Sequence, residues 1–297
     1  MGIWAGNTAL AETIKIGLID FALRHESLKA FQGVTVRSIT FETSALRPAR
    51  MQSAAHVRGH GDVMAAELID AFQTASPNAE LELFVASPFL EDPATGRQTI
   101  DYAQLEFAYI WLARQGVKIV AQTFVAKESP ALEAAVAAAA REGLVILTSA
   151  GNGPRQNAVP PFPASYDNTI GISTTALSGE LSLEENRNTY VRYSVPAPAI
   201  SGLKLRQDPE LGSLAGSSRA TVAAAGLLGA LTTRYRLETR EDALLLLDTL
   251  AVPAADYGHQ KVYGLGVLVA DVVAQHVRSN LTPPQLKRLL RDERLSA

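Results

Sequence analysis

Two adjacent serines, Ser217 and Ser218, lie in the stretch GSLAGSSRATVAAAGLLGAL, where small residues precede an Ala- and Leu-rich helical pattern. A serine hydroxyl is a weak nucleophile until a neighbouring base accepts its proton. A helix that begins at such a serine directs unpaired N–H groups and its positive dipole end toward a developing negative charge. The two serines are therefore either helix caps or a candidate nucleophile, and other residues must decide between these interpretations.

Three further residues have the chemistry that a serine nucleophile needs. His60 lies between glycines at the start of a helical pattern, and a histidine near its ordinary pKa can act as a general base. Asp20 ends an apolar run, and a buried carboxylate can orient an imidazole. Asn152 follows another apolar run, and its amide can donate to an oxyanion. Each has a simpler structural interpretation alone, but with Ser218 the set indicates acyl transfer.

Short apolar runs alternate with helical patterns along the chain. The sequence predicts buried strands at Ile14–Asp20, Leu81–Ser87, Val117–Val125, Leu144–Ala150 and Thr169–Thr174. It predicts helices over residues 62–73, 101–115 and 129–143, the last with Ser129 as N-cap and Pro130 in the first turn. Continuous apolar strands separated by helices favour an α/β fold with a mostly parallel central sheet flanked by helices. Such sheets place their functional sites beyond the carboxyl ends of the strands, where Asp20 and Asn152 would lie.

Composition limits the class of protein. The chain has 297 residues, of which 47% are hydrophobic, a formal net charge of −3 and no cysteine. We expect a single domain over residues 1–279 and an amphipathic helical tail over residues 280–297. Without a long charged run, neither nucleic acid nor an anionic membrane is expected as partner. The first residues lack the pattern of a secretory signal, and no run is long and apolar enough to span a membrane. The sequence therefore predicts a cytoplasmic protein, unless it is a mature fragment from which a leader was removed.

Four motifs in order give the chain a resemblance to the subtilisin-like serine proteases, the subtilases. IGLIDFALRHESL is similar to their Asp motif and GHGDVMAAELI to their His motif. ILTSAGNGP, followed by FPASYDNTIGIST, resembles the segment with the oxyanion Asn, and GSSRATVAAAGLLGAL resembles the Ser motif. VYGLGVLVADVVAQ resembles the end of the family's domain, so the likeness covers residues 14–275. It implies a three-layer subtilisin-like fold and a serine endopeptidase.

The resemblance assigns a role to each candidate residue. It makes Ser218 the nucleophile, His60 the general base and then the general acid, and Asp20 the residue that orients His60. Asn152 would donate its side-chain amide to the oxyanion, beside the backbone N–H of Ser218.

The resemblance also implies residues that bind substrate. Thr123, Phe124 and Val125 stand where the substrate-binding strand usually has S-x-G, and Ala150 and Gly151 precede the Asn. That strand is expected to bind an extended peptide through backbone hydrogen bonds, as a sheet edge does. Val125 at the rim of the primary pocket would narrow it, which favours a small or medium apolar side chain before the cleaved bond.

Two departures from the family pattern are charged. Asp62 stands where the His motif usually has Thr. It could place a negative charge near the base and raise the pKa of that base, or it could cap the following helix, and we expect the cap. Arg219 stands where a Met usually follows the nucleophile. Its cation could assist the oxyanion or pair with a carboxylate of a substrate or regulator.

Alternative functions remain open at this point. His56 and His60 have the H-x-x-x-H spacing of two zinc ligands, but no third ligand is evident and no metal site is predicted. Subtilases often bind calcium, yet the sequence contains no EF-hand-like loop or dense acidic cluster, so no cofactor is expected. A catalytically silent, subtilase-like module that binds peptides is a second alternative. The expected partners are a peptide or protein substrate, such as a precursor peptide, or a regulatory protein.

Overall fold

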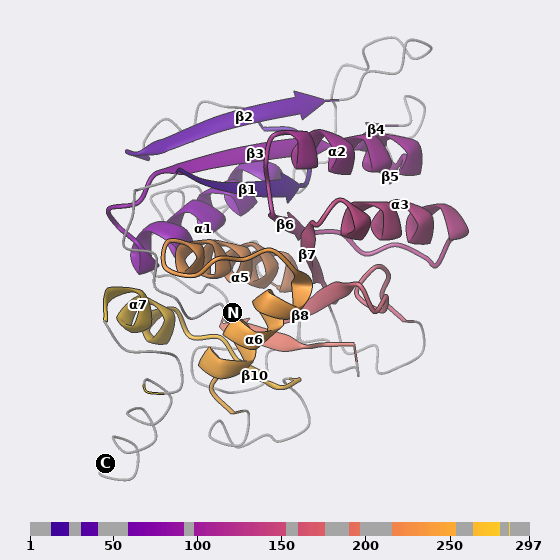
Figure 1. Ribbon diagram of the computed structural model, residues 1–297. Coiled ribbons are helices and arrows are strands. Elements are labelled where there is room, and N and C mark those ends of the chain that lie inside the picture. The colour runs from indigo at the N-terminus through magenta and orange to yellow at the C-terminus, as the bar shows by residue number, and fades with distance from the viewer. Residues whose placement is uncertain are drawn as a thin grey trace.

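An eight-stranded sheet forms the centre of the molecule (Figure 1). The computed structural model describes residues 13–23, 31–40, 59–91, 98–152, 160–175, 190–196, 216–253, 264–279 and 285. The strand order is β10-β9-β8-β7-β6-β1-β3-β2, and every neighbouring pair is parallel. The strands of this sheet are β1 (Ile14–Ile19), β2 (Val34–Thr40), β3 (Leu81–Ser87), β6 (Ile119–Gln122), β7 (Val145–Ser149), β8 (Thr169–Thr175), β9 (Tyr193–Pro196) and β10 (Gly266–Val267). A separate antiparallel pair joins β4 (Phe89–Glu91) to β5 (Gln98–Ile100).

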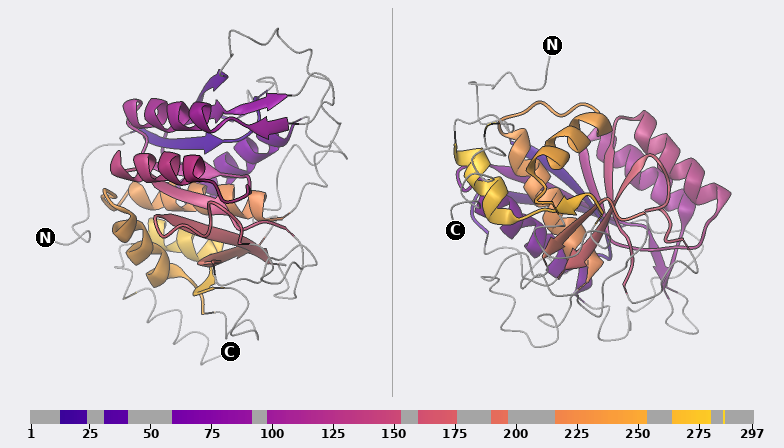
Figure 2. Two further views of the ribbon diagram at one scale, coloured as in Figure 1. Left: turned by 90° about the vertical axis from the view of Figure 1, so that its right-hand side faces the viewer. Right: turned by 90° about the horizontal axis from the view of Figure 1, so that it is seen from below.

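Helices cover both faces of the sheet, so the predicted three-layer architecture is confirmed (Figures 1 and 2). The helices are α1 (His60–Ala75), α2 (Tyr102–Arg114), α3 (Pro130–Arg141), α5 (Ser217–Thr232), α6 (Arg240–Leu250) and α7 (Ala270–Arg278). One hydrophobic cluster joins the sheet to α1, α5, α6 and α7, and a second joins it to α2 and α3.

Burial on two faces explains why the strands are continuous apolar runs. In β1, Ile16 and Leu18 belong to the cluster with α1 and α5, whereas Ile19 belongs to the cluster with α2 and α3. Successive side chains of a strand point to opposite faces, and here both faces are covered. All five strands predicted from sequence are confirmed, each with bounds within three residues of those expected.

Some details differ from the sequence predictions. Strand β6 ends at Gln122 and lies between β1 and β7, so Thr123–Val125 follow an interior strand and are not part of a sheet edge. Helix α1 begins at His60 with Gly59 as its N-cap, so the prediction that Asp62 caps this helix is wrong. Asp62 instead lies buried in the first turn. The expected tail helix, residues 280–297, lies outside the described residues except for Gln285, so the domain boundary stays a prediction.

Helices α1 and α5 make close backbone contact. A Cβ atom added to Gly226 of α5 would lie 2.4 Å from the carbonyl oxygen of Leu68 and 3.0 Å from the backbone nitrogen of Phe72, both in α1. Any side chain at position 226 would push the helices apart. This glycine therefore sets the point where the two helices cross.

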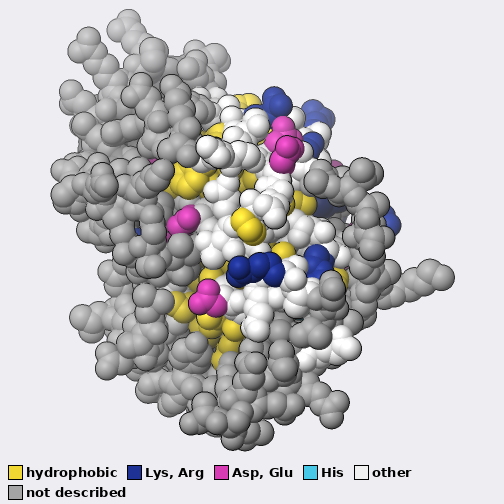
Figure 3. Space-filling model, turned by 90° about the vertical axis from the view of Figure 1, so that its left-hand side faces the viewer, with side chains coloured by type: hydrophobic (Ala, Val, Ile, Leu, Met, Phe, Trp, Pro, Cys, Tyr) yellow, Lys and Arg dark blue, Asp and Glu magenta, His cyan; other side chains and the backbone are white. Residues whose placement is uncertain are grey.

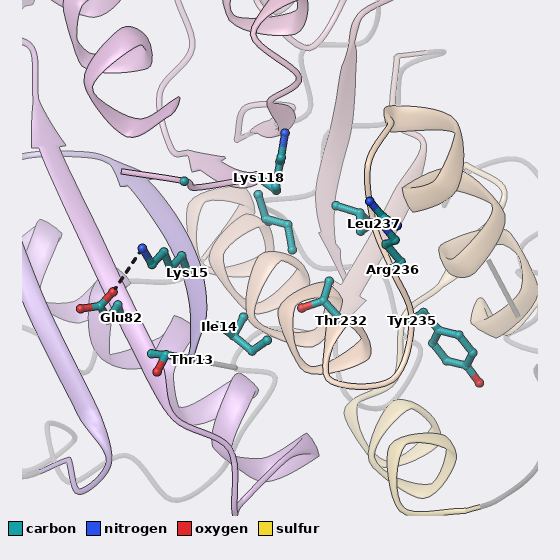
Figure 4. Close-up of a pocket in the computed structure, with 11 residues that line it drawn as sticks. Thr13, Ile14, Lys15, Glu82, Lys118, Thr232, Tyr235, Arg236 and Leu237 are labelled. Atoms are coloured by element: carbon teal, nitrogen blue, oxygen red, sulfur yellow. Dashed lines mark ion pairs between the residues drawn. The ribbon is translucent and has the colours of Figure 1, made fainter. Parts of the chain in front are cut away.

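A cavity of about 810 Å³ opens at the amino ends of β1, β3 and β6. Lys15, Lys118 and Arg236 line it, and Lys15 forms an ion pair with Glu82 at 3.7 Å (Figure 4). The surface at this end of the sheet has Lys and Arg side chains beside acidic and apolar ones (Figure 3). The cavity lies at the opposite end of the strands from Asp20 and Asn152, so it is separate from the predicted site.

Within the described ranges, none of the helices combines the length and the apolar character that crossing a membrane would require.

Candidate active site

The sequence-predicted residues meet at the carboxyl edge of three neighbouring strands. Asp20 directly follows β1, Thr123 follows β6, and Asn152 comes three residues after the end of β7. These strands are adjacent in the sheet, so their carboxyl ends deliver the three residues to one edge. His60 and Ser218 lie in the first turns of α1 and α5, whose amino ends reach the same edge.

Asp20 is the buried centre of this group, with 0% of its surface exposed. Its Oδ1 accepts a hydrogen bond from the backbone N–H of Phe21 at 2.6 Å and lies 2.8 Å from Nδ1 of His60. Its Oδ2 accepts a hydrogen bond from the hydroxyl of Thr123 at 2.5 Å. Both oxygens therefore have donors, which a buried carboxylate requires.

Asp20 fixes which nitrogen of His60 holds a proton. An ionised carboxylate only accepts hydrogen bonds, so Nδ1 must donate and, in the neutral ring, Nε2 keeps a free lone pair. Burial lowers the pKa of His60, but the negative charge of Asp20 and their hydrogen bond outweigh it, so the pKa is raised above 6.5. The ring is 18% exposed and Phe21 contacts it edge-on at 5.7 Å between centroids. This imidazole can accept a proton from a group that approaches Nε2.

Ser218 is linked to Asp20 through Thr123. The Ser218 hydroxyl donates to the backbone carbonyl of Thr123 at 2.9 Å, and the Thr123 hydroxyl donates to Asp20. Among the described residues, no hydrogen bond joins His60 to Ser218. Rotation about the Cα–Cβ bond of Ser218 changes the direction of its hydroxyl, and catalytic hydrogen bonds are often long or absent without substrate.

Hydrogen bonds from Ser217 fix the orientation of the Asn152 amide. Its Oδ1 accepts from the backbone N–H and from the hydroxyl of Ser217, each at 2.8 Å. Because the Ser217 hydroxyl donates to Asn152, Ser149 is the donor in the 2.5 Å contact between Ser149 Oγ and Ser217 Oγ. The oxygen of the amide therefore points to Ser217, and the Nδ2 group keeps its two hydrogens for another acceptor.

Gly216 allows this contact. Its φ is 103°, and a Cβ atom there would lie 2.6–2.8 Å from the side-chain amide atoms of Asn152. A larger residue would be strained and would displace the amide.

The five residues expected to bind substrate follow the carboxyl ends of β6 and β7. Phe124 is nearly buried and contacts Phe89 at 5.9 Å between ring centroids, whereas Val125 is 43% exposed. Ala150 is buried and Gly151 is partly exposed. Thr123 is buried, and its hydroxyl bonds to Asp20, so its side chain supports the carboxylate.

Arg219 lies elsewhere than expected. Its side chain is only 3% exposed and forms an ion pair with Glu67 of α1 at 2.5 Å. The expectation that Arg219 assists an oxyanion or pairs with a carboxylate of a partner is therefore wrong. The positive charge of Arg219 instead pairs with Glu67 inside the protein.

Metal binding gains no support from the described residues. Within them, no group of three His, Asp or Glu side chains could hold a metal ion. His56 lies outside the described residues, so the zinc alternative and the calcium question are not tested by the structure.

Sequence reasoning missed Ser149 and Glu67, and it did not find the contact of Ser217 with Asn152. Ser149 and Ser217 orient the Asn152 amide, and Glu67 pairs with Arg219. The only sequence signal for Glu67 is a charge among apolar residues in VMAAELI. Its partner is 152 positions away, so the pairing requires the fold.

Comparisons with known proteins show which family this chain resembles. The subtilase family model matches residues 11–266. Subtilisin DY of Bacillus licheniformis is 24% identical over 278 residues, which cover 88% of this chain and 91% of that protein. A subtilisin-like serine protease of Rhodotorula mucilaginosa is 25% identical over 223 residues, which cover 73% of this chain and 63% of that protein.

Solved structures share the fold. A lanthipeptide protease matches with a TM-score of 0.61 and 15% identity, covering 89% of this chain and 88% of that one. The epidermin leader peptide processing serine protease of Staphylococcus aureus matches with a TM-score of 0.62 and 17% identity, covering 91% of this chain and 77% of that one. A prenylagaramide maturation protease matches with a TM-score of 0.61 and 14% identity, covering 90% of this chain and 94% of that one.

The Asp20–His60 contact predicts how His60 titrates. In an NMR titration, the His60 signal, assigned by its loss in His60→Gln, should have a midpoint above 6.5. In Asp20→Asn the negative charge that raises the pKa of His60 is absent, while burial still lowers this pKa, so the midpoint should fall below 6.5. Protonated His60 should stabilise the fold fully below pH 6.5, and this contribution should disappear as pH rises through the folded pKa.

His276 provides an internal control for this titration. Burial, followed by the charge of Arg234, lowers its pKa to about 4. Its signal should be the same in the wild type and in Asp20→Asn. A wild-type midpoint for His60 below 6.5 would contradict the proposed effect of Asp20.

Proposed function

Since the chain belongs to the subtilase family of serine endopeptidases, we propose that Asp20, His60 and Ser218 form its catalytic triad and that Asn152 completes its oxyanion hole. The observation that carries this proposal is the set of hydrogen bonds linking His60 to Asp20, Asp20 to Thr123 and Thr123 to Ser218. These contacts gather four segments of the chain at one edge of the sheet.

In the acylation step, Ser218 Oγ attacks the carbonyl carbon of the peptide bond and its proton moves to Nε2 of His60. To reach Nε2, the Ser218 hydroxyl leaves the carbonyl oxygen of Thr123. The His60 imidazolium is stabilised by the ionised Asp20 and then gives its proton to the leaving amine. Water, activated by the same imidazole, hydrolyses the acyl-enzyme and restores Ser218.

The negative charge that develops on the carbonyl oxygen needs donors that are already in place. The Nδ2 group of Asn152 is one, because Ser217 holds the other end of the amide. The backbone N–H of Ser218 is a second, because it belongs to the first turn of α5, where N–H groups lack partners within the helix. Both donors need little reorganisation during the reaction, and for this reason they stabilise the transition state.

A fluorophosphonate probe tests the nucleophile. We expect intact-mass analysis to show one label on the wild-type chain and none on Ser218→Ala. Ser129→Ala is a matched control, because it removes a hydroxyl from the N-cap of α3 and should leave labelling unchanged. Asn152→Ala should lower kcat for peptide cleavage by about 10²- to 10³-fold with little change in KM. A folded wild-type protein without label would favour the silent peptide-binding module.

We infer that the substrate is a precursor peptide cleaved at a defined position. Support comes from structures of similar fold whose proteins process a leader peptide or mature a prenylagaramide. Phe124, Val125, Ala150 and Gly151 would contact the peptide on the side before the cleaved bond. Val125 is 43% exposed and stands at the expected rim of the primary pocket. A cytoplasmic location and an additional regulatory partner remain part of this proposal.

Cleavage of a peptide library tests the specificity. If Val125 lies at the rim of the primary pocket as proposed, its branched side chain narrows that pocket, and cleavage should favour small or medium apolar residues before the scissile bond. Val125→Gly should admit larger side chains at the same position. A wild-type profile dominated by large aromatic or basic residues would contradict the assignment of Val125.

A further inference from the structure

A buried ion pair connects the helix of the proposed base to the helix of the proposed nucleophile. Nε and Nη2 of Arg219 in α5 both donate to Oε2 of Glu67 in α1, at 3.1 and 2.5 Å. Glu67 is 0% exposed and Arg219 is 3% exposed. The pair is therefore shielded from solvent and from salt.

The pair joins the two helices that carry the proposed base and nucleophile. Arg219 directly follows Ser218, in the first turn of α5. Glu67 comes seven residues after His60 in α1, which is about two helical turns, so the two side chains lie on one side of α1. Figure 1 shows the two helices side by side on one face of the sheet.

The ion pair and the crossing at Gly226 attach α5 to α1 at two separate points. Gly226 sets the closest approach of the helices, seven residues after Arg219, or about 10 Å along α5. Without the ion pair, α5 would be held to α1 by apolar packing alone, which permits a small tilt about the close approach at Gly226. Ser218 is eight residues from Gly226, about 12 Å, so a tilt of about 5° would move it by about 1 Å.

Stability alone does not account for this pair. A well-packed apolar pair of similar volume is often as stabilising as a buried ion pair, or more so. Two donors of one guanidinium that converge on one carboxylate oxygen, however, fix where that oxygen lies relative to the guanidinium plane. Apolar contacts permit small displacements along the helices.

We propose that Arg219 and Glu67 are positioning residues that hold Ser218 in register with His60. The inference rests on the proposed function, because it assigns the pair to the alignment of that triad. Neither residue touches the reacting atoms. Their effect on the reaction is exerted through the angle between α5 and α1.

The test compares labelling kinetics of the wild type with those of the double variant Arg219→Met and Glu67→Leu. Removing both residues together leaves neither Glu67 nor Arg219 buried without the other, so the Tm of this variant should lie closer to that of the wild type than the Tm of either single variant. The maximal rate of fluorophosphonate labelling should fall by about 10²-fold, as expected for a misplacement of about 1 Å. The probe concentration at half-maximal rate should change by less than about threefold, since probe binding is retained.

Two further variants separate alignment from stability. Arg219→Met alone leaves the Glu67 carboxylate buried without this guanidinium, so its Tm should fall well below that of the double variant. Leu247→Ala creates a cavity in α6, where the side chain is fully buried, and should lower the Tm while keeping the wild-type labelling rate.

The outcomes distinguish the two proposals. If the wild type is not labelled at Ser218, the proposed function fails. If the wild type is labelled and the double variant is labelled at the same maximal rate, the function stands and the positioning role of the pair is wrong. If Leu247→Ala slows labelling as much as the double variant, the effect follows stability and the positioning role is also wrong.

Discussion

A fully buried carboxylate is tolerated only if donors reach both of its oxygens, and Asp20 meets this requirement with groups from three segments. The donors are the backbone after β1, the hydroxyl of Thr123 after β6 and the imidazole of His60 at the start of α1. Without one of these donors, the buried negative charge would lack a hydrogen bond that it cannot replace with water. The hydrogen bonds to Asp20 therefore hold three parts of the chain together at the carboxyl ends of the strands.

The same requirement arranges the groups around Asn152. The exposed amide is fixed because Ser217 directs two donors at its oxygen, and Gly216 has no side chain to displace it. The glycine at position 216, directly before α5, is thus a consequence of the close approach of the backbone to a polar side chain. The sheet and the two crossing helices provide a rigid frame, and the polar groups at its edge are oriented by hydrogen bonds.

Much of this arrangement follows from local sequence patterns. The strands that are covered on both faces are predictable because their runs are apolar throughout, as in LELFVAS. Strand β2, VTVRSIT, is missed because it is not a continuous apolar run: it is the last strand of the sheet, and four of its seven residues are polar. Strands β9 and β10 have four and two residues, too few for a periodic pattern.

The candidate site is predictable in its residue types but not in its contacts. Asp20 and Asn152 are found because they follow apolar strands, and Ser218 because a helix begins beside it. The strand order that brings β1, β6 and β7 together is not a local property of the sequence. The same holds for the hydroxyl of Thr123 on Asp20 and for the pair between Glu67 and Arg219, which join residues more than 100 positions apart.

A crystal structure of the chain with a phosphonate bound to Ser218 tests the central claim most directly, that four side chains converge on one reacting carbon. The account predicts that the phosphonyl oxygen lies about 2.7–3.1 Å from both Nδ2 of Asn152 and the backbone nitrogen of Ser218. The imidazole of His60 should keep its contact with Asp20 and face the bonded oxygen of Ser218. An adduct whose oxygen points away from Asn152, or an imidazole out of reach of Ser218, would contradict the account.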